Sequence, residues 1–171
     1  PEDPYKGEWI WHPEFNLFKS SSTPVIVADI TGNGLGDIIA GGGHEYGLTW
    51  WEQKLEKSKR TWTPHPIDPY NSQYHDLKWI DIDGDGSMEL VTGKRYRAHC
   101  GHDPGADDCV GIYYFKWTGE TFSKQVIDYG KPGQATGCGI YFDTADLTGN
   151  GLPDIVAPGK DGLYVFFNLG E

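Results

Sequence analysis

The sequence is short of methionine, cysteine and positive charge, and it has no long apolar run. Its 171 residues include one methionine and three cysteines, whereas glycine occurs 24 times and aromatic residues make up 14%. This composition favours many short strands and turns over helices. No stretch approaches the roughly 18 apolar residues expected of a membrane-spanning segment. A chain of this length can bury one core, so we expect a single domain.

The scarcity of positive charge limits the classes of molecule that the protein can bind. Lysine and arginine total 14 against 25 aspartates and glutamates, which gives a formal net charge of −11. This excess argues against nucleic acids and anionic membranes as partners. Bound cations would neutralise part of it. The first residues, Pro1 to Pro4, contain no signal peptide, and we expect a processed or truncated start.

The most informative stretch is an acidic turn at residues 81–89, with the sequence DIDGDGSME. Oxygen-bearing side chains recur at every second position, with glycines where the backbone must turn back. Calcium takes six or more oxygen ligands, and a tight loop can supply them from alternate positions. The residues before and after this turn resemble strands, not the helices of an EF-hand. The predicted calcium ligands are Asp81, Asp83, Asp85, Glu89 and the backbone carbonyl of Ser87.

Two further copies of this turn indicate a repeat architecture. They occupy residues 29–37 and 146–154, and the three first aspartates are 52 and then 65 residues apart. The outer copies hold two carboxylates each, so we expect tight calcium binding in the middle turn and weak or no binding outside. The alternative is that all three are hydrogen-bonded turns. The outer candidate ligands are Asp29, Thr31, Asn33, Asp37, Asp146, Thr148, Asn150 and Asp154.

The segments around the turns repeat as well, and they predict an all-β fold of four-stranded antiparallel β-propeller blades. A β-sandwich is the alternative, because it also uses regular short strands. The expected strands one are 23–28, 76–80 and 140–145, and strands two are 38–41, 90–93 and 155–157. Strands three are 48–51, 112–115 and 163–167; strands four are 62–68 and 122–128, with a further copy at 8–12.

These units divide the chain into about three blades. Residues 1–22 are expected to form strand four of a preceding or closing blade plus a linker. Residues 23–70 form the first blade, residues 71–130 the second, and residues 131–171 strands one to three of the third. A closed propeller normally needs four to eight blades. We therefore expect a partial propeller, or part of a larger ring completed by blades of the same or another chain.

The cysteines suggest the compartment. Cys100 and Cys109 flank a polar loop, and a disulfide between them would indicate an oxidising, extracellular location. Cys138 lies in an apolar context and is expected to be a buried thiol.

Blade topology places a second group of residues opposite the acidic turns. Segments just before strand one or just after strand two meet at the other end of the blades. Arginine and lysine there would neutralise an anionic sugar, and histidine or tyrosine would transfer protons, as β-elimination from a uronate requires. The histidines could instead bind Zn²⁺, or the cations could be loop residues paired with Asp103, Asp107 and Asp108. The candidate catalytic residues are His44, His75, Lys94, Arg95, Tyr96, His99 and Lys160.

The three turns resemble FG-GAP/VCBS repeats, the calcium-binding propeller repeats also found in integrin alpha subunits, over most of residues 23–168. Segments 43–48, 93–105 and 158–163 look like a secreted fungal and bacterial branch of that group. Some such relatives are polysaccharide lyases or sugar dehydratases with seven blades and a histidine-lined, metal-containing cleft. The resemblance implies β-elimination on a carbohydrate by His44, His75 and Arg95, although this chain is shorter than a seven-bladed fold.

The sequence therefore predicts a secreted, carbohydrate-active propeller, a carbon–oxygen lyase acting on an acidic polysaccharide. The alternative is a non-catalytic, calcium-stabilised propeller that binds a glycan or a protein.

Overall fold

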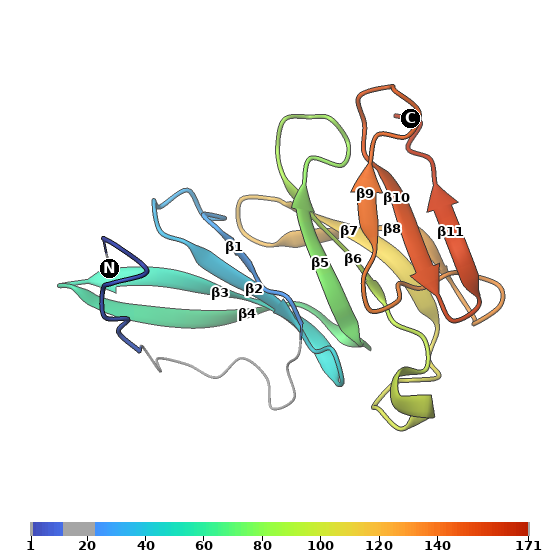
Figure 1. Ribbon diagram of the computed structural model, residues 1–171, viewed down its shortest axis with the longest axis horizontal. Coiled ribbons are helices and arrows are strands. Elements are labelled where there is room, and N and C mark those ends of the chain that lie inside the picture. The colour runs from blue at the N-terminus through green and yellow to red at the C-terminus, as the bar shows by residue number, and fades with distance from the viewer. Residues whose placement is uncertain (1, 12–22, 171) are drawn as a thin grey trace.

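Three antiparallel sheets stand side by side in a computed structural model that describes residues 2–11 and 23–170. Figure 1 shows the sheets as successive layers in chain order. The first contains β1 (Ile26–Ala28), β2 (Asp37–Gly41), β3 (Tyr46–Glu56) and β4 (Lys59–Ser72). The second contains β5 (Tyr74–Ile80), β6 (Glu89–Lys94), β7 (Val110–Trp117) and β8 (Phe122–Gly130). The third contains β9 (Asp143–Ala145), β10 (Asp154–Gly159) and β11 (Gly162–Phe166).

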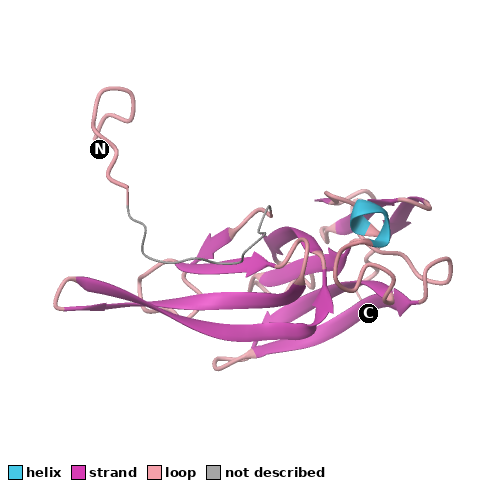
Figure 2. Ribbon diagram, turned by 90° about the horizontal axis from the view of Figure 1, so that it is seen from below, coloured by secondary structure: helices cyan, strands magenta, loops and turns pink. Residues whose placement is uncertain are grey.

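The prediction of all-β, four-stranded blades is confirmed. Strands follow one another across each sheet in chain order, which is the meander of a propeller blade. One short 3₁₀ turn, η1 (Ala98–Gly101), is the only helical element among the described residues (Figure 2). Within those residues, no helix has the length and apolar character needed to cross a membrane. Strand β4 continues to Ser72, two residues past the expected end of the first blade.

Apolar side chains fill the two spaces between the sheets. Leu48 and Trp50 of β3 point to the same face of the first sheet and meet Leu77 and Leu90 of the second sheet. On its other face the second sheet packs Val91 and similar residues against the third sheet. Each sheet is therefore stabilised by its neighbour, because a single sheet leaves its apolar faces in water. Both interfaces hold the strand ends in fixed positions.

Gly41 allows the first two sheets to approach closely. A Cβ built at Gly41 would lie 2.5 Å from the Cβ of Tyr74 and 2.6 Å from its carbonyl oxygen. We expect Gly41→Ala to lower the free energy of unfolding by about 1–3 kcal/mol, because the backbone of β5 must shift. Urea denaturation at neutral pH measures this loss. Gly34→Ala is the control: its Cβ meets no atom within 4 Å, so only the strain of its positive φ, about 1 kcal/mol, is expected. Equal losses would contradict the steric explanation.

The predicted first strand of the third blade, residues 140–145, is wrong for Ile140–Phe142, because β9 begins at Asp143. This segment bonds to the second sheet instead. The backbone N–H of Phe142 donates to Asp76 at 3.0 Å, and the Ile140 carbonyl bonds to His75 at 3.2 Å. Cys138 likewise bridges to Arg95, and it is buried as expected. The segment therefore connects two blades.

The predicted N-terminal strand does not form over Glu8–Trp11, and His12 lies outside the described residues. Trp9 and Trp11 are exposed, and this part of the chain turns back through a bond from the Gly7 N–H to the Asp3 carbonyl. It lies far from β11 (Figure 1). Among the described residues, no strand pairs with the outer edge of β11, where Val165 and Phe167 are exposed. Completion of the ring by further blades stays a prediction, which the molecular mass in solution tests.

Candidate functional site

The three acidic turns connect the first and second strands of their sheets, as the repeat predicts. In each turn the first aspartate folds the loop around itself. Asp81 accepts hydrogen bonds from the N–H groups of Gly84 and Gly86 at 2.7 and 2.9 Å. Asp29 and Asp146 accept equivalent bonds, and the amide bonds from Gly151 and its neighbours lower the pKa of Asp146. All three turns share one hydrogen-bonded frame.

The last acidic residue of each turn is buried at the strand pair. Asp37 and Asp154 are fully buried. Asp37 accepts bonds from the Ile30 and Thr31 N–H groups of the turn and from the Gln53 N–H of β3. Asp154 accepts bonds from the Leu147 N–H of the turn and from the Asn168 N–H just after β11. These two carboxylates therefore close the outer turns by hydrogen bonds.

The middle turn fits a divalent cation better. One oxygen from each of Asp81, Asp83 and Glu89 lies within 4.8 Å of the others, and carboxylate oxygens are the ligands calcium prefers. Burial raises the pKa of Glu89, and the Asp83 and Asp85 charges raise it further. The Lys116 ammonium lies against Asp83 and Asp85 at 2.5 and 2.7 Å, so a positive charge is already accommodated there. With Asp85 and the Ser87 carbonyl, these residues would hold the ion and gain rigidity from it.

The outer turns fit an ion less well. Thr31 and Thr148 replace the third-position carboxylate, and Asn33 and Asn150 replace the fifth. The two asparagine amides donate to backbone carbonyls of Gln53 and Asn168. The hydroxyl oxygen of Thr31 is buried without a hydrogen-bond partner.

The predicted catalytic residues lie at the opposite ends of the strands. Figure 1 shows η1 on the side away from the β5–β6 and β9–β10 turns. His44 belongs to the β2–β3 connection, His75 to β5 and His99 to η1. The ring centroids of His44 and His75 are 5.6 Å apart, and those of His44 and His99 are 4.6 Å apart. Three histidines from separate segments therefore meet in one cluster.

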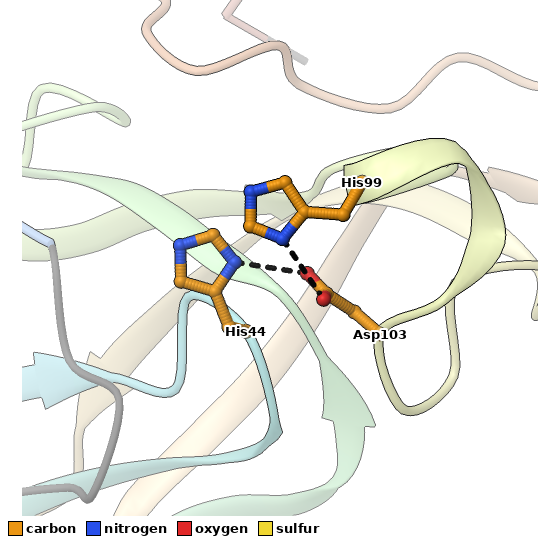
Figure 3. A group of neighbouring side chains, drawn as sticks. All are labelled: His44, His99 and Asp103. Atoms are coloured by element: carbon orange, nitrogen blue, oxygen red, sulfur yellow. Dashed lines mark hydrogen bonds and ion pairs between the residues drawn. The ribbon is translucent and has the colours of Figure 1, made fainter.

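Asp103 holds two of these histidines (Figure 3). The Nδ1 atoms of His44 and His99 lie 2.9 and 3.0 Å from its two oxygens, and the imidazoles stack within 6° of parallel. Burial would raise the pKa of Asp103, but the hydrogen bonds from His44 and His99 outweigh this and lower it. An ionised carboxylate only accepts, so both Nδ1 atoms carry hydrogen and the lone pairs lie on Nε2.

His75 has the same tautomer for another reason. Its Nδ1 lies 3.2 Å from the Ile140 carbonyl oxygen, which can only accept, so Nδ1 carries the hydrogen. Burial lowers the pKa of His75, and the positive charge of Arg95 adds to this. The imidazole is therefore neutral at neutral pH, with a basic Nε2. This is the state that a general base requires.

A pocket of about 380 Å³ lies beside His75, between the second and third sheets. Arg95, Tyr96, Tyr141 and Lys160 line it, together with Ile140, whose carbonyl bonds to His75. The Lys160 ammonium also bonds to the Arg97 carbonyl at 2.6 Å. The pocket therefore combines two cations with two phenols, a set that suits an anionic, hydroxylated ligand.

Lys94 is the predicted catalytic residue that the structure places elsewhere. Its side chain is fully buried, and its ammonium lies 3.4 Å from the Arg95 carbonyl. It does not line the pocket of Arg95. Burial lowers its pKa. Lys94 thus has a structural contact with the backbone of the segment that follows β6.

The predicted disulfide is wrong, because Cys100 and Cys109 are both free thiols. Other contacts close this loop: the Arg97 N–H bonds to the Ala106 carbonyl, and the Arg97 guanidinium pairs with Asp107 at 3.1 Å. The Cys109 thiol instead contacts the Tyr129 hydroxyl. An extracellular location stays a prediction.

The same loop is strained. Arg97, His99 and Cys100 have φ values of 44°, 46° and 60°. Such conformations cost about 1–3 kcal/mol each and persist only where the surroundings enforce them. Here the bond from the Arg97 N–H to the Ala106 carbonyl and the His99–Asp103 bond hold the loop in this shape.

Sequence reasoning treated Asp103 only as a counter-ion and did not find Tyr141. The acidic residue within the His-Asp-Pro-Gly segment, residues 102–105, was the available signal for Asp103. Tyr141 lies in a segment that the pattern assigned to a strand, so nothing local indicated its place in the pocket.

One comparison bears on this arrangement. Residues 29–92 match the family model of the FG-GAP-like repeat. This match supports the predicted relationship to the FG-GAP propeller family. The FG-GAP-like segment runs from the first acidic turn through the middle one and into β6, so it contains the repeating unit of the chain. No curated protein matches the chain.

Proposed function

We propose that this FG-GAP-like domain binds an acidic polysaccharide at the face opposite its acidic turns and cleaves it by β-elimination. The observation that carries the proposal is the pocket of Arg95, Tyr96, Tyr141 and Lys160, whose wall contacts His75 through the Ile140 carbonyl and the Tyr141 ring. Cations for a carboxylate, a neutral imidazole base and phenols are the groups that this reaction needs.

The roles follow from the chemistry of each group. Arg95 and Lys160 bind the uronate carboxylate and stabilise the charge that develops on it. His75 Nε2 takes the C5 proton, and that C–H pair becomes the C4=C5 double bond. The C4–O bond breaks, and the departing oxygen takes a proton from a phenol, Tyr96 or Tyr141. His44 and His99 flank the base, and Asp103 orients them.

The His44, His99 and Asp103 cluster also has the donor types of a zinc site. Their ligand atoms lie within 4.8 Å of one another, and two imidazoles with a carboxylate are common zinc ligands. A metal bound through both Nδ1 atoms would replace the two protons that now face Asp103. Bound there, Zn²⁺ would act as a Lewis acid on the substrate carboxylate.

The test follows the ultraviolet absorbance of the unsaturated product from polyuronates. We expect product from the wild type, and about ten- to a hundredfold less from His44→Ala and Arg95→Ala, because each loses a group that positions or neutralises the sugar. His65→Ala is the matched control: His65 stacks on Trp50 and bonds to Glu52, away from this face.

Parallel reactions with and without a zinc chelator separate metal-dependent from metal-free chemistry. Unchanged product in both His44→Ala and Arg95→Ala would remove this site. Glycan binding by the wild type without product from any acidic polysaccharide would establish the alternative, a non-catalytic binding propeller.

A further inference from the structure

The three acidic turns differ in how their fifth residue is tied to strand three. In the outer turns this residue is asparagine. Asn33 donates its amide N–H to the Gln53 carbonyl at 3.1 Å, and Asn150 donates to the Asn168 carbonyl at 2.7 Å. The middle turn has Asp85 at this position, and an ionised carboxylate has no hydrogen to donate.

A lysine from strand three replaces that tie in the middle turn. The Lys116 ammonium of β7 bonds to Asp85 at 2.7 Å and to Asp83 at 2.5 Å. Lys116 directly follows Phe115, which pairs with Leu90. The equivalent residues are Glu52, which follows the partner of Ile38, and Phe167, which follows the partner of Ile155. Glu52 there pairs with Lys54 and His65. Of the three repeats, the middle one thus combines additional carboxylates, Asp83 and Asp85, with a lysine side chain that bonds to them.

These bonds use carboxylates that a divalent ion would need. A calcium ion takes six to eight oxygens. The ammonium bonds to one oxygen, Oδ2, of each of these two carboxylates. An ion bound by the same two oxygens would have to displace it.

We propose that Lys116 is a tethered competitor for the divalent cation of the middle turn. Its ammonium offsets part of the negative charge of the turn in the absence of the ion and so helps the turn to fold without metal. Cation binding displaces the ammonium from Asp83 and Asp85, which lowers the apparent affinity. Both carboxylates border a cavity of about 740 Å³ between the second and third sheets, which gives a hydrated ion access.

Calorimetric titration of CaCl₂ into the metal-free protein tests this competition. We expect Lys116→Met to bind Ca²⁺ about tenfold more tightly than the wild type, because the competing pair is removed. The thermal midpoint should also rise more on Ca²⁺ addition in this variant. Lys54→Met is the matched control: Lys54 pairs with Glu52 in the first sheet, so its loss should change the affinity less than twofold.

Two further variants keep the test decisive if Lys116→Met does not fold. Lys116→Gln keeps a donor without the charge and should also tighten Ca²⁺ binding. Asp85→Asn gives the middle turn the residue of the outer turns, and it should fold while losing Ca²⁺ binding. Unchanged or weaker Ca²⁺ binding in the folded Lys116 variant, or no binding in either it or the wild type, would overturn the proposal.

Discussion

Replacing Asp103 by alanine is expected to lower kcat/KM for cleavage of a polyuronate, measured as formation of the unsaturated product, by about two to four orders of magnitude. Asp103 is a positioning residue that acts on two imidazoles together: it accepts hydrogen bonds from His44 and His99 and fixes their tautomers. Its loss releases both rings and also frees the strained backbone at His99. The effect should therefore exceed that of a single histidine substitution.

The conservative variant separates this role from simple support of the fold. Asp103→Asn should place an N–H against one Nδ1, reverse its tautomer and rescue little activity.

Asp107→Ala is the control for Asp103, because Asp107 lies in the same loop but pairs with Arg97 at the surface. We expect this variant to keep its rate within about threefold, since exposed ion pairs contribute little. Wild-type activity in Asp103→Ala, with a native circular dichroism spectrum, would refute the role of the cluster.

The second large effect is on stability. Asp68 of β4 is 5% exposed and joins the first two sheets: it bonds to Lys124 of β8 at 2.6 Å and to the Tyr74 hydroxyl at 2.7 Å. The Lys124 ammonium also lies 3.7 Å from the centre of the Tyr113 ring. We expect Asp68→Ala to lower the free energy of unfolding by about 2–4 kcal/mol at neutral pH, because these partners lose a common acceptor.

The pH dependence of this effect has a definite sign. Burial alone would raise the pKa of Asp68, but hydrogen bonds from Lys124, Tyr74 and Asn71 outweigh it and lower the pKa to about 2, against an ordinary 3.8. A lowered folded-state pKa adds stability that is complete above the ordinary value and is lost as the pH falls toward 2. The difference between wild type and Asp68→Ala should therefore shrink between pH 4 and pH 2.

The repeat supplies a matched control for Asp68. Asp128 has the same position in the second sheet, since Asp68 pairs with Leu48 and Asp128 with Ile112. Its carboxylate accepts a hydrogen bond from the N–H of Thr136, in the chain segment that directly follows β8. Asp128→Ala should cost about 1 kcal/mol. Denaturant unfolding of both variants measures the difference, and equal losses would show that the bond between the sheets contributes nothing extra.

Most of the fold could be predicted from local patterns. Repeated apolar or aromatic-rich segments such as residues 48–51 predicted the strands, and the spacing from Asp81 to Glu89 predicted the turns, because both signals lie within a few residues. The errors lie where distant segments compete. Ile140 bonds to His75, 65 residues away, in place of the start of a strand. Arg97 and Asp107 close the loop that Cys100 and Cys109 were expected to bridge.

The sequence predicted on which end of the blades the candidate site lies, but not which side chains contact one another there. Topology correctly sent His44, His75 and His99 to one end of the blades, since strand order alone decides that. It could not indicate that Asp103 joins His99 to His44, because the contact with His44 joins residues 59 positions apart. Lys116 was missed for the same reason, lying 31 residues from Asp85.

The connection from Cys138 to Phe142 has a practical consequence for anyone dissecting this chain. It supplies the carbonyl that orients His75 and one wall of the neighbouring pocket, yet it precedes the third sheet in the sequence. A truncation placed after β8 would keep two whole sheets and every clustered histidine, but it would remove the backbone that fixes the imidazole of His75. The smallest excisable unit therefore ends inside the third repeat and does not coincide with a blade boundary.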